Sequence, residues 1–171
     1  MLDTAAPGSA IPADGLTDLR QLLQSLQPAA DPVRYYFCSQ TQLDADLAMQ
    51  AFAVVREAEG WTLILPEYAL PDADEAAADA RAQLLCSSAA FIRISLKVHS
   101  SLQAVGLTAA VSTALATHNI SCNLIAGFYH DHLFVPAADA AAALALLEQL
   151  SADMRRMQQS LSTGMDDAGR Q

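Results

Sequence analysis

The stretch Arg93–Pro136, RISLKVHSSLQAVGLTAAVSTALATHNISCNLIAGFYHDHLFVP, decides the fold. Over residues 91–98, isoleucine, leucine and valine alternate strictly with Phe91, Arg93, Ser95 and Lys97, which predicts a strand with one buried face. After Gly106 a second apolar set recurs at helical spacing and predicts a helix that covers this face: Leu107, Val111, Ala114, Leu115 and His118. An alternating segment, a polar turn at residues 129–131 and a short apolar run then predict a hairpin. The stretch therefore predicts a β-α-β-β unit.

The remaining chain repeats this pattern of helices and strands. We expect helices over 16–27, 72–85 and 137–157, strands over 33–38, 52–56 and 61–65, and a hairpin at Gly60. This gives six strands and four helices, whereas two complete β-α-β-β-α-β units need eight strands. Either the units share strands or a partner chain completes the sheets, and a homodimer is the economical form of the second case. We expect a lead-in over 1–13, units over 14–88 and 89–157, and a flexible tail over 158–171.

Composition restricts the classes of partner and the location. The formal net charge is −10 and Lys97 is the single lysine, which argues against a nucleic-acid surface because phosphate binding requires clustered cations. The chain lacks an apolar run long enough to span a membrane, and its first residues lack the features of a secretory signal. Cys38, Cys86 and Cys122 show no metal-type spacing, so we expect buried free thiols in a cytoplasmic protein.

A set of short motifs gives a family resemblance. The strings HSS, VGLTA, ISCN and YHDH follow one another between His99 and His132, and YYF at 35–37 and REAEGWTLIL at 56–65 add to them. In this order and spacing they resemble the ACT domain superfamily, and in particular small bacterial proteins made of two ACT-type units. The resemblance implies an α+β, ferredoxin-like βαββαβ sandwich with two pseudo-repeated units and antiparallel sheets. It also implies dimeric or tandem packing and binding of small ligands, most often amino acids.

The connection between the strand at 91–98 and the following helix is the candidate ligand site. A glycine that opens a helix leaves backbone N–H groups unpaired at the positive end of the helix dipole, where a carboxylate fits. ACT-type binders commonly hold their effector at this connection, so the resemblance implies the same place. The alternative is that the serines only cap local backbone and the glycine only makes a turn. The candidate ligand-binding residues are His99, Ser100, Ser101, Val105, Gly106, Leu107, Thr108 and Asn123.

Other chemistry is less well supported by the sequence. His130-Asp131-His132 could hold a metal together with His99, but these residues must also make the hairpin turn, so we expect a hydrogen-bonded turn and no metal. Ser100 beside His99 lacks the context of a catalytic serine, so we expect no catalytic residue, no cofactor and no enzymatic activity. The sequence thus predicts a cytoplasmic amino-acid-binding regulatory protein that acts in trans on an enzyme. The alternative is a structural or oligomerisation module that binds a partner protein without a ligand.

Overall fold

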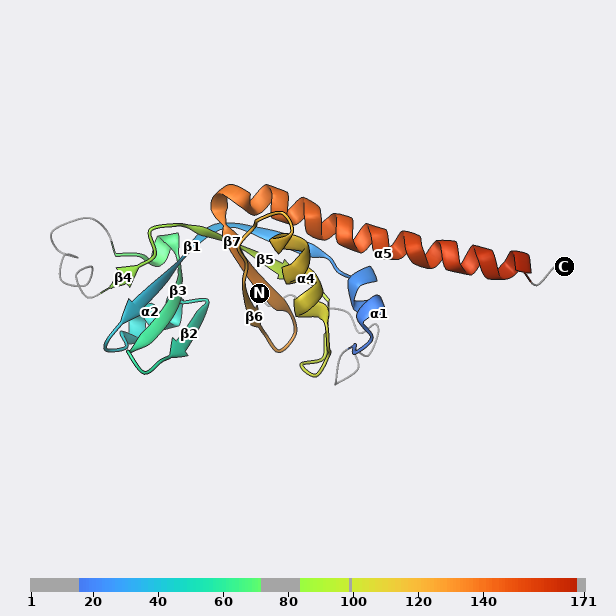
Figure 1. Cartoon of the computed structure of the whole chain (residues 1–171). Helices are drawn as coiled ribbons and strands as arrows, with labels where there is room; N and C mark the ends of the chain where they lie inside the picture. Colours follow the sequence, from blue (N-terminus) through green and yellow to red (C-terminus); the bar gives the residue numbers. More distant parts are fainter. Residues whose placement is uncertain (1–15, 72–83, 99, 169–171) are drawn as a thin grey trace, which may run out of the picture.

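The computed structural model describes residues 16–71, 84–98 and 100–168, and its strands form one seven-stranded sheet (Figure 1). Nearly all of the helix expected over 72–85 lies outside the described residues, as does His99. The strands are β1 (Pro28–Gln40), β2 (Ala53–Arg56), β3 (Trp61–Pro66), β4 (Leu85–Cys86), β5 (Phe91–Leu96), β6 (Asn123–Ala126) and β7 (Asp131–Pro136). The helices are α1 (Leu19–Gln24), α2 (Ala45–Gln50), α4 (Leu107–Ala116) and α5 (Ala140–Ala168), with short 3-10 turns at Glu67–Ala69 and Ala137–Asp139.

The N-terminal unit is built on the second half of β1. There β1 pairs antiparallel with β3 on one side and with β4 on the other, and β2 pairs with β3. The resulting order β4-β1-β3-β2 is that of a ferredoxin-like β-α-β-β-α-β unit, so the expected fold class is confirmed. Helix α2 connects β1 to β2, and the hairpin expected at Gly60 lies between β2 and β3.

The C-terminal unit takes its fourth strand from the beginning of the chain. Its order is β1-β5-β7-β6, and the first half of β1 occupies the position that a strand after α5 would fill. The pairing of β1 with β5 shifts between Ala30 and Arg34, where β1 is bulged opposite Arg93. The two units therefore share strand β1. Of the two alternatives that the sequence left open, the structure shows shared strands, and no partner chain is needed to complete the sheet.

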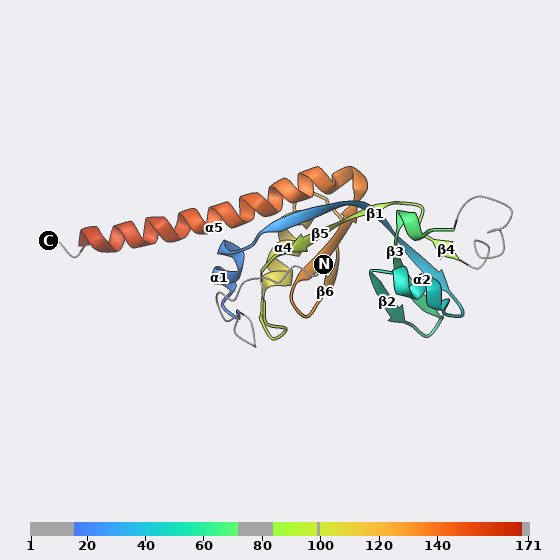
Figure 2. The ribbon, with the colours of Figure 1, turned by 180° about the vertical axis from the view of Figure 1, so that it is seen from behind.

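The face of the C-terminal sheet that carries the helices holds the larger apolar core. Ile94 and Leu96 of β5 point to this face, and α1, α4 and the first half of α5 cover it (Figures 1 and 2). Leu107, Val111 and Leu115 of α4 are buried as the helical spacing predicted, whereas His118 is exposed. The alternation in β5 thus selects which residues meet the helices and leaves Arg93 and Ser95 for the opposite face.

Aromatic side chains on that opposite face join the two units. Phe134 of β7 is fully buried, and its ring lies in edge contact with Tyr35 and Phe52, with centroid distances of 5.5 and 5.3 Å. Phe52 also meets His132 at 4.9 Å. Since Phe52 precedes β2 of the N-terminal unit and Phe134 belongs to the C-terminal unit, this aromatic cluster fixes one unit against the other.

Three helices differ from the sequence prediction. Helix α1 is shorter than expected because Asp18 caps it, by accepting from the backbone N–H of Gln21 at 2.9 Å. Helix α2 was missed, although Asp44 caps it by accepting from two backbone N–H groups. Helix α5 continues to Ala168, into the segment for which a tail was expected.

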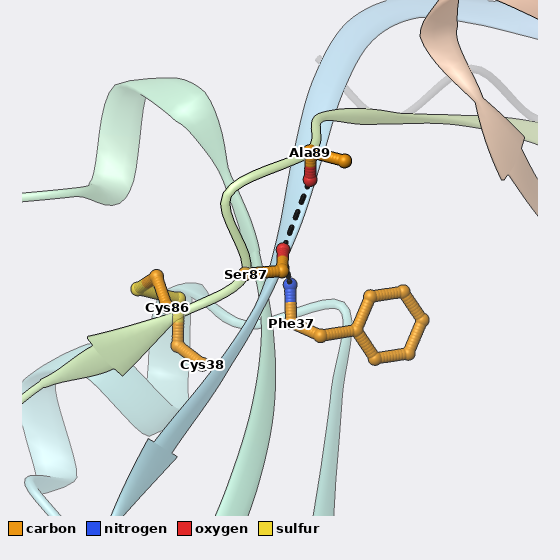
Figure 3. The surroundings of a disulfide bond; sticks show 5 residues. All are labelled: Phe37, Cys38, Cys86, Ser87 and Ala89. Atoms are coloured by element: carbon orange, nitrogen blue, oxygen red, sulfur yellow. Dashed lines mark hydrogen bonds between the residues drawn. A yellow bond between two sulfur atoms is a disulfide. The ribbon is translucent and has the colours of Figure 1, made fainter.

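The expectation of three free thiols is wrong. Cys38 and Cys86 stand directly opposite each other on the antiparallel strands β1 and β4 and form a disulfide (Figure 3). Cys122 is a free cysteine. The next residue, Ser87, continues the pairing, because its N–H donates to the carbonyl of Phe37 and its hydroxyl accepts from the Phe37 N–H. The disulfide therefore holds the two-residue strand β4 at the edge of the N-terminal sheet.

Candidate functional site

The connection from β5 to α4 packs against Leu16 and helix α1. Leu16 forms an isolated parallel bridge with Ser100, and the N–H of Ser101 donates to the carbonyl of Leu16 at 2.9 Å. Gly106 precedes α4 with φ +102°, in the left-handed region, and a Cβ at this position would lie 2.9 Å from Leu19 Cδ2. Leu16 and α1 therefore support this connection from one side.

Both serines of the predicted site already have partners. The hydroxyl of Ser100 donates to the buried carboxylate of Asp131 at 3.2 Å, and the hydroxyl of Ser101 accepts from the N–H of Gln103 at 3.2 Å. Only the contact of Ser101 is the local backbone bond that the alternative interpretation described, whereas Ser100 bonds to a side chain of a distant strand.

The backbone around Gly106 keeps unused donors. Within the described part of the chain, the N–H groups of Val105, Gly106, Leu107 and Thr108 have no acceptor, as expected for the first turn of a helix without a capping side chain. Leu107 is buried beneath them, whereas Val105 is 83% exposed and Leu102 is 67% exposed. The connection thus presents free N–H donors beside two exposed apolar side chains.

The other predicted residues lie on different faces. Asn123 is exposed on the edge strand β6, on the face opposite Leu124, which packs into the core that α4 covers. Asp131 and His132 alternate along β7, so Asp131 meets Ser100 while His132 accompanies Ser95 on the aromatic side, with Ser95 Oγ 2.9 Å from His132 Nδ1. Among the described residues no group of three acidic, histidine or cysteine side chains could hold a metal ion.

Replacing Gly106 with alanine will destabilise the protein by about 2 kcal/mol, because a left-handed backbone disfavours a Cβ and the new methyl group meets Leu19. Chemical denaturation of both proteins measures this difference. Thr108→Ala, two residues later in ordinary helical backbone and exposed, is the control and should change stability by less than about 0.5 kcal/mol. Equal stability of the Gly106→Ala variant and the parent would contradict the prediction.

A second group of polar side chains lies between the units, and the sequence analysis missed it. Nη2 of Arg93 contacts Oδ2 of Asp31 at 2.5 Å, and its guanidinium carbon lies 4.6 Å from the ring centre of Phe52 and 5.3 Å from that of Tyr35. Asp31 also accepts from the hydroxyl of Tyr35 at 2.9 Å and from the N–H of Val33 at 3.0 Å. We call Asp31, Tyr35, Phe52 and Arg93 the Arg93 cluster.

The bulge in β1 explains how the Arg93 cluster forms. Between the register pairs Ala30–Ile94 and Arg34–Ile92, β5 contributes only Arg93 while β1 contributes residues 31–33. The extra residues turn the Asp31 carboxylate toward the guanidinium, and bulges commonly redirect a side chain in this way. The contact between Asp31 and Arg93 depends on the shift of register between β1 and β5. The alternating sequence of β5 alone could not predict it.

The environment shifts the pKa values of the cluster. Burial raises the pKa of Asp31, but the hydrogen bonds from Val33 and Tyr35 and the charge of Arg93 outweigh burial and leave the pKa below its ordinary value. Burial and the hydrogen bond to Asp31 raise the pKa of Tyr35 to about 12. Burial, followed by the charges of Arg93 and His130, lowers the pKa of His132. At neutral pH the cluster therefore holds an ion pair beside a neutral tyrosine, and the neighbouring His132 is neutral as well.

The lowered pKa of His132 predicts acid sensitivity. A histidine whose pKa is lower in the folded state than in the unfolded state stabilises the fold above its unfolded pKa of about 6.5, and this stability is lost as the pH falls from there toward the folded pKa. Melting temperatures between pH 8 and pH 5 should therefore decline less in His132→Gln than in the parent. His118→Gln, at an exposed histidine, is the control and should follow the parent curve. Identical pH curves for His132→Gln and the parent would contradict this account.

Comparisons with known proteins decide the family. Two family models, each described as an ACT domain, match residues 14–81 and 92–149, and together they cover more than half of the chain. The chain belongs to the ACT domain family. ACT domains are typically regulatory and generally bind small molecules such as amino acids. The resemblance found in the sequence and the tandem arrangement are thereby confirmed.

Several solved structures share the fold. A Vibrio cholerae protein of unknown function, described as a possible transport protein, is 42% identical with a TM-score of 0.63, over 78% of this chain and 95% of that one. An Agrobacterium tumefaciens protein is 13% identical with a TM-score of 0.58, over 74% and 89% of the two chains. The regulatory subunit of aspartate kinase from Thermus thermophilus is 13% identical with a TM-score of 0.53, over 72% and 95%. No match was found among the curated proteins.

Proposed function

We propose that this ACT protein is a non-catalytic regulator that binds an amino acid at the β5–α4 connection and acts in trans on a separate enzyme. The observation that carries the proposal is the row of N–H groups from Val105 to Thr108, at the positive end of α4, for which the described residues supply no acceptor. A carboxylate bound there would satisfy several of these donors at once. The aspartate kinase regulatory subunit of similar fold supports the regulatory role.

A second copy of the chain would complete this site. Leu102 and Val105 expose apolar surface next to the free donors, and burying them against a partner would also exclude water from a bound carboxylate. Ser100, Ser101 and Thr108 remain the proposed contacts to the polar groups of the ligand. Asn123 faces away from the core that α4 covers and is not proposed as a contact within the same chain. His99 lies outside the described residues. We therefore propose a homodimer with ligands at its interface.

A thermal-shift screen of the twenty amino acids tests the proposal. A ligand that binds only the folded state at a hundred times its Kd adds about 2.7 kcal/mol of stability and raises the melting temperature. Thr108→Asp should remove the part of the shift that comes from this site, because its carboxylate occupies the helix start and repels that of the ligand. Thr113→Asp, an exposed threonine farther along α4, adds the same charge and should keep the shift. No shift with any amino acid at 10 mM, or an equal loss in both variants, would refute this site.

A partner-binding module remains the second candidate function, and α5 favours it. The helix continues past α1 into solvent (Figure 1), and residues 155–160 are all exposed. Such a segment offers a docking surface that needs no metabolite. Capture of one specific protein by the parent chain, without added amino acid and lost on truncation after residue 154, would support this function over ligand sensing.

We also propose a cytoplasmic location, where the metabolic enzymes that such a regulator would control are found. The described residues contain no helix able to cross a membrane. The Cys38–Cys86 disulfide favours an oxidising compartment instead, since such bonds are rare in the cytosol. Cell fractionation decides between them, and recovery of the protein outside the cytoplasmic fraction would contradict our placement.

A further inference from the structure

The Arg93 cluster borders a cavity between the two units. The cavity measures about 320 Å³, which is within the range of small-molecule sites. Asp31 and Arg93 form its charged wall, Val33, Phe52 and Pro66 its apolar wall, and Gln50 and Tyr68 its rim. It lies on the sheet face opposite α4 and is therefore separate from the β5–α4 connection.

The ion pair in this cavity is poorly explained by stability alone. The side chains of Arg93 and Asp31 are only 23% and 18% exposed, and a pair this buried is often no more stabilising than apolar side chains of the same volume. Nε of Arg93 is buried and has no hydrogen-bond partner among the described residues. Arg93 is held between two aromatic rings and faces a bulge that presents its counter-ion. We expect such an arrangement where an arginine orients a ligand in a binding site.

The hydrogen-bonding groups of Arg93 and Asp31 that have no partner within the described residues indicate which ligand fits the cavity. The guanidinium group has five N–H donors, and in the described structure it donates only through Nη2, to Asp31. Asp31 Oδ1 accepts only from the N–H of Val33, so this oxygen can accept one further hydrogen bond. A carboxylate can therefore bind beside Arg93 while an ammonium group binds beside Asp31. A molecule that carries both groups on one carbon satisfies both residues without separating their ion pair.

We propose that this cavity is a second ligand site, which binds the carboxylate and ammonium groups of a small amino acid with an uncharged side chain. The apolar wall receives the side chain of the ligand. Gln50 and Tyr68, both exposed at the rim, contact the part of the ligand that faces solvent. This site goes beyond the proposed function at α4 and does not depend on it.

Calorimetric titration of the parent chain with L-valine, L-leucine and L-methionine tests the proposal, with two analogues of leucine as probes of its charges. 4-Methylpentanoate lacks the ammonium group and 3-methylbutylamine lacks the carboxylate. Each should bind at least tenfold more weakly than leucine, since one charged contact is missing. Absence of binding by all three amino acids at 10 mM, or equal binding of leucine and both analogues, would overturn the proposal.

Variants assign the binding to this cavity. Arg93→Lys and Asp31→Asn should each weaken binding at least tenfold, and Gln50→Ala at the exposed rim should weaken it measurably without disturbing the ion pair. Met49→Ala, at the neighbouring residue of α2, is 87% exposed and does not line the cavity, so it should bind as the parent does. If Arg93→Lys or Asp31→Asn does not fold, Gln50→Ala and the analogue titrations still decide the outcome.

The Thr108→Asp variant separates this site from the one at α4. In that variant, the calorimetric stoichiometry should retain one bound amino acid per chain. Binding that disappears in Thr108→Asp but is unaffected by Gln50→Ala and Asp31→Asn would overturn the second site and support the first. Binding that survives Thr108→Asp but is lost in Asp31→Asn would support the second site alone.

Discussion

Replacing Cys38 and Cys86 together with alanine will lower the free energy of unfolding by about 4 kcal/mol. The disulfide joins residues 48 positions apart, and closing a loop of this length removes about that much conformational freedom from the unfolded chain. In a domain of this size the melting temperature should fall by on the order of 10 °C. Thermal and denaturant unfolding with and without a reductant measure the effect.

The free cysteine supplies the control for this experiment. Cys122→Ala removes a half-buried thiol without opening the disulfide, so it should keep the dependence of stability on reductant. The double variant should lose that dependence entirely. A parent protein whose melting temperature is unchanged by reductant, and whose intact mass shows three free thiols, would contradict the pairing of β1 with β4 through these residues.

Replacing Arg93 with methionine will destabilise the protein by about 3 kcal/mol, because Asp31 is then left as a largely buried carboxylate without its counter-ion. Adding Asp31→Asn should recover most of this loss. Asparagine is neutral. Its side-chain oxygen can still accept from the Val33 N–H, and its amide NH2, in place of the second carboxylate oxygen, can donate to the Tyr35 hydroxyl oxygen. A double-mutant cycle by urea unfolding measures the coupling between the two residues.

An exposed ion pair in the same chain is the matched control. Arg156 contacts Asp153 one turn earlier on α5, with about half or more of each side chain exposed. The same substitutions, Arg156→Met and Asp153→Asn, should change stability little and show little coupling, because water screens such pairs. Equal coupling in the two cycles would mean that enclosure between Tyr35 and Phe52 does not strengthen the pair of Arg93 and Asp31.

Local patterns in the sequence predicted the parts of the fold that depend on local physics. Alternation in β5 and helical spacing in α4 followed from which face of each element is buried, and Gly106 marked the start of α4. Helix α2 was missed because six residues provide too little periodicity to outweigh the polar segment around its cap, Asp44. The first half of β1 was missed because proline and alanine at its start are poor strand formers, and pairing with β5 overrides that preference.

Of the two candidate sites, one could be predicted from local sequence and the other could not. The free N–H groups near Gly106 are a property of one helix start and could be predicted from the sequence. The Arg93 cluster combines Asp31, Phe52 and Arg93, which are brought together by the register of β1 on β5 and by the packing of one unit on the other. The disulfide likewise depends on the register of β1 on β4. Such register could not be read from single segments of the chain.

Because the two units share β1, we expect that the C-terminal unit cannot fold when it is expressed without the N-terminal one. A polypeptide starting at residue 89 would carry β5, β6 and β7 but would leave the outer edge of β5 without the neighbour that β1 supplies. Such a fragment should recruit a strand from another molecule and aggregate. Adding residues 16–40 as a separate peptide should restore a soluble heterodimer. The C-terminal unit therefore needs β1 to fold, although β1 lies in the N-terminal repeat of the sequence.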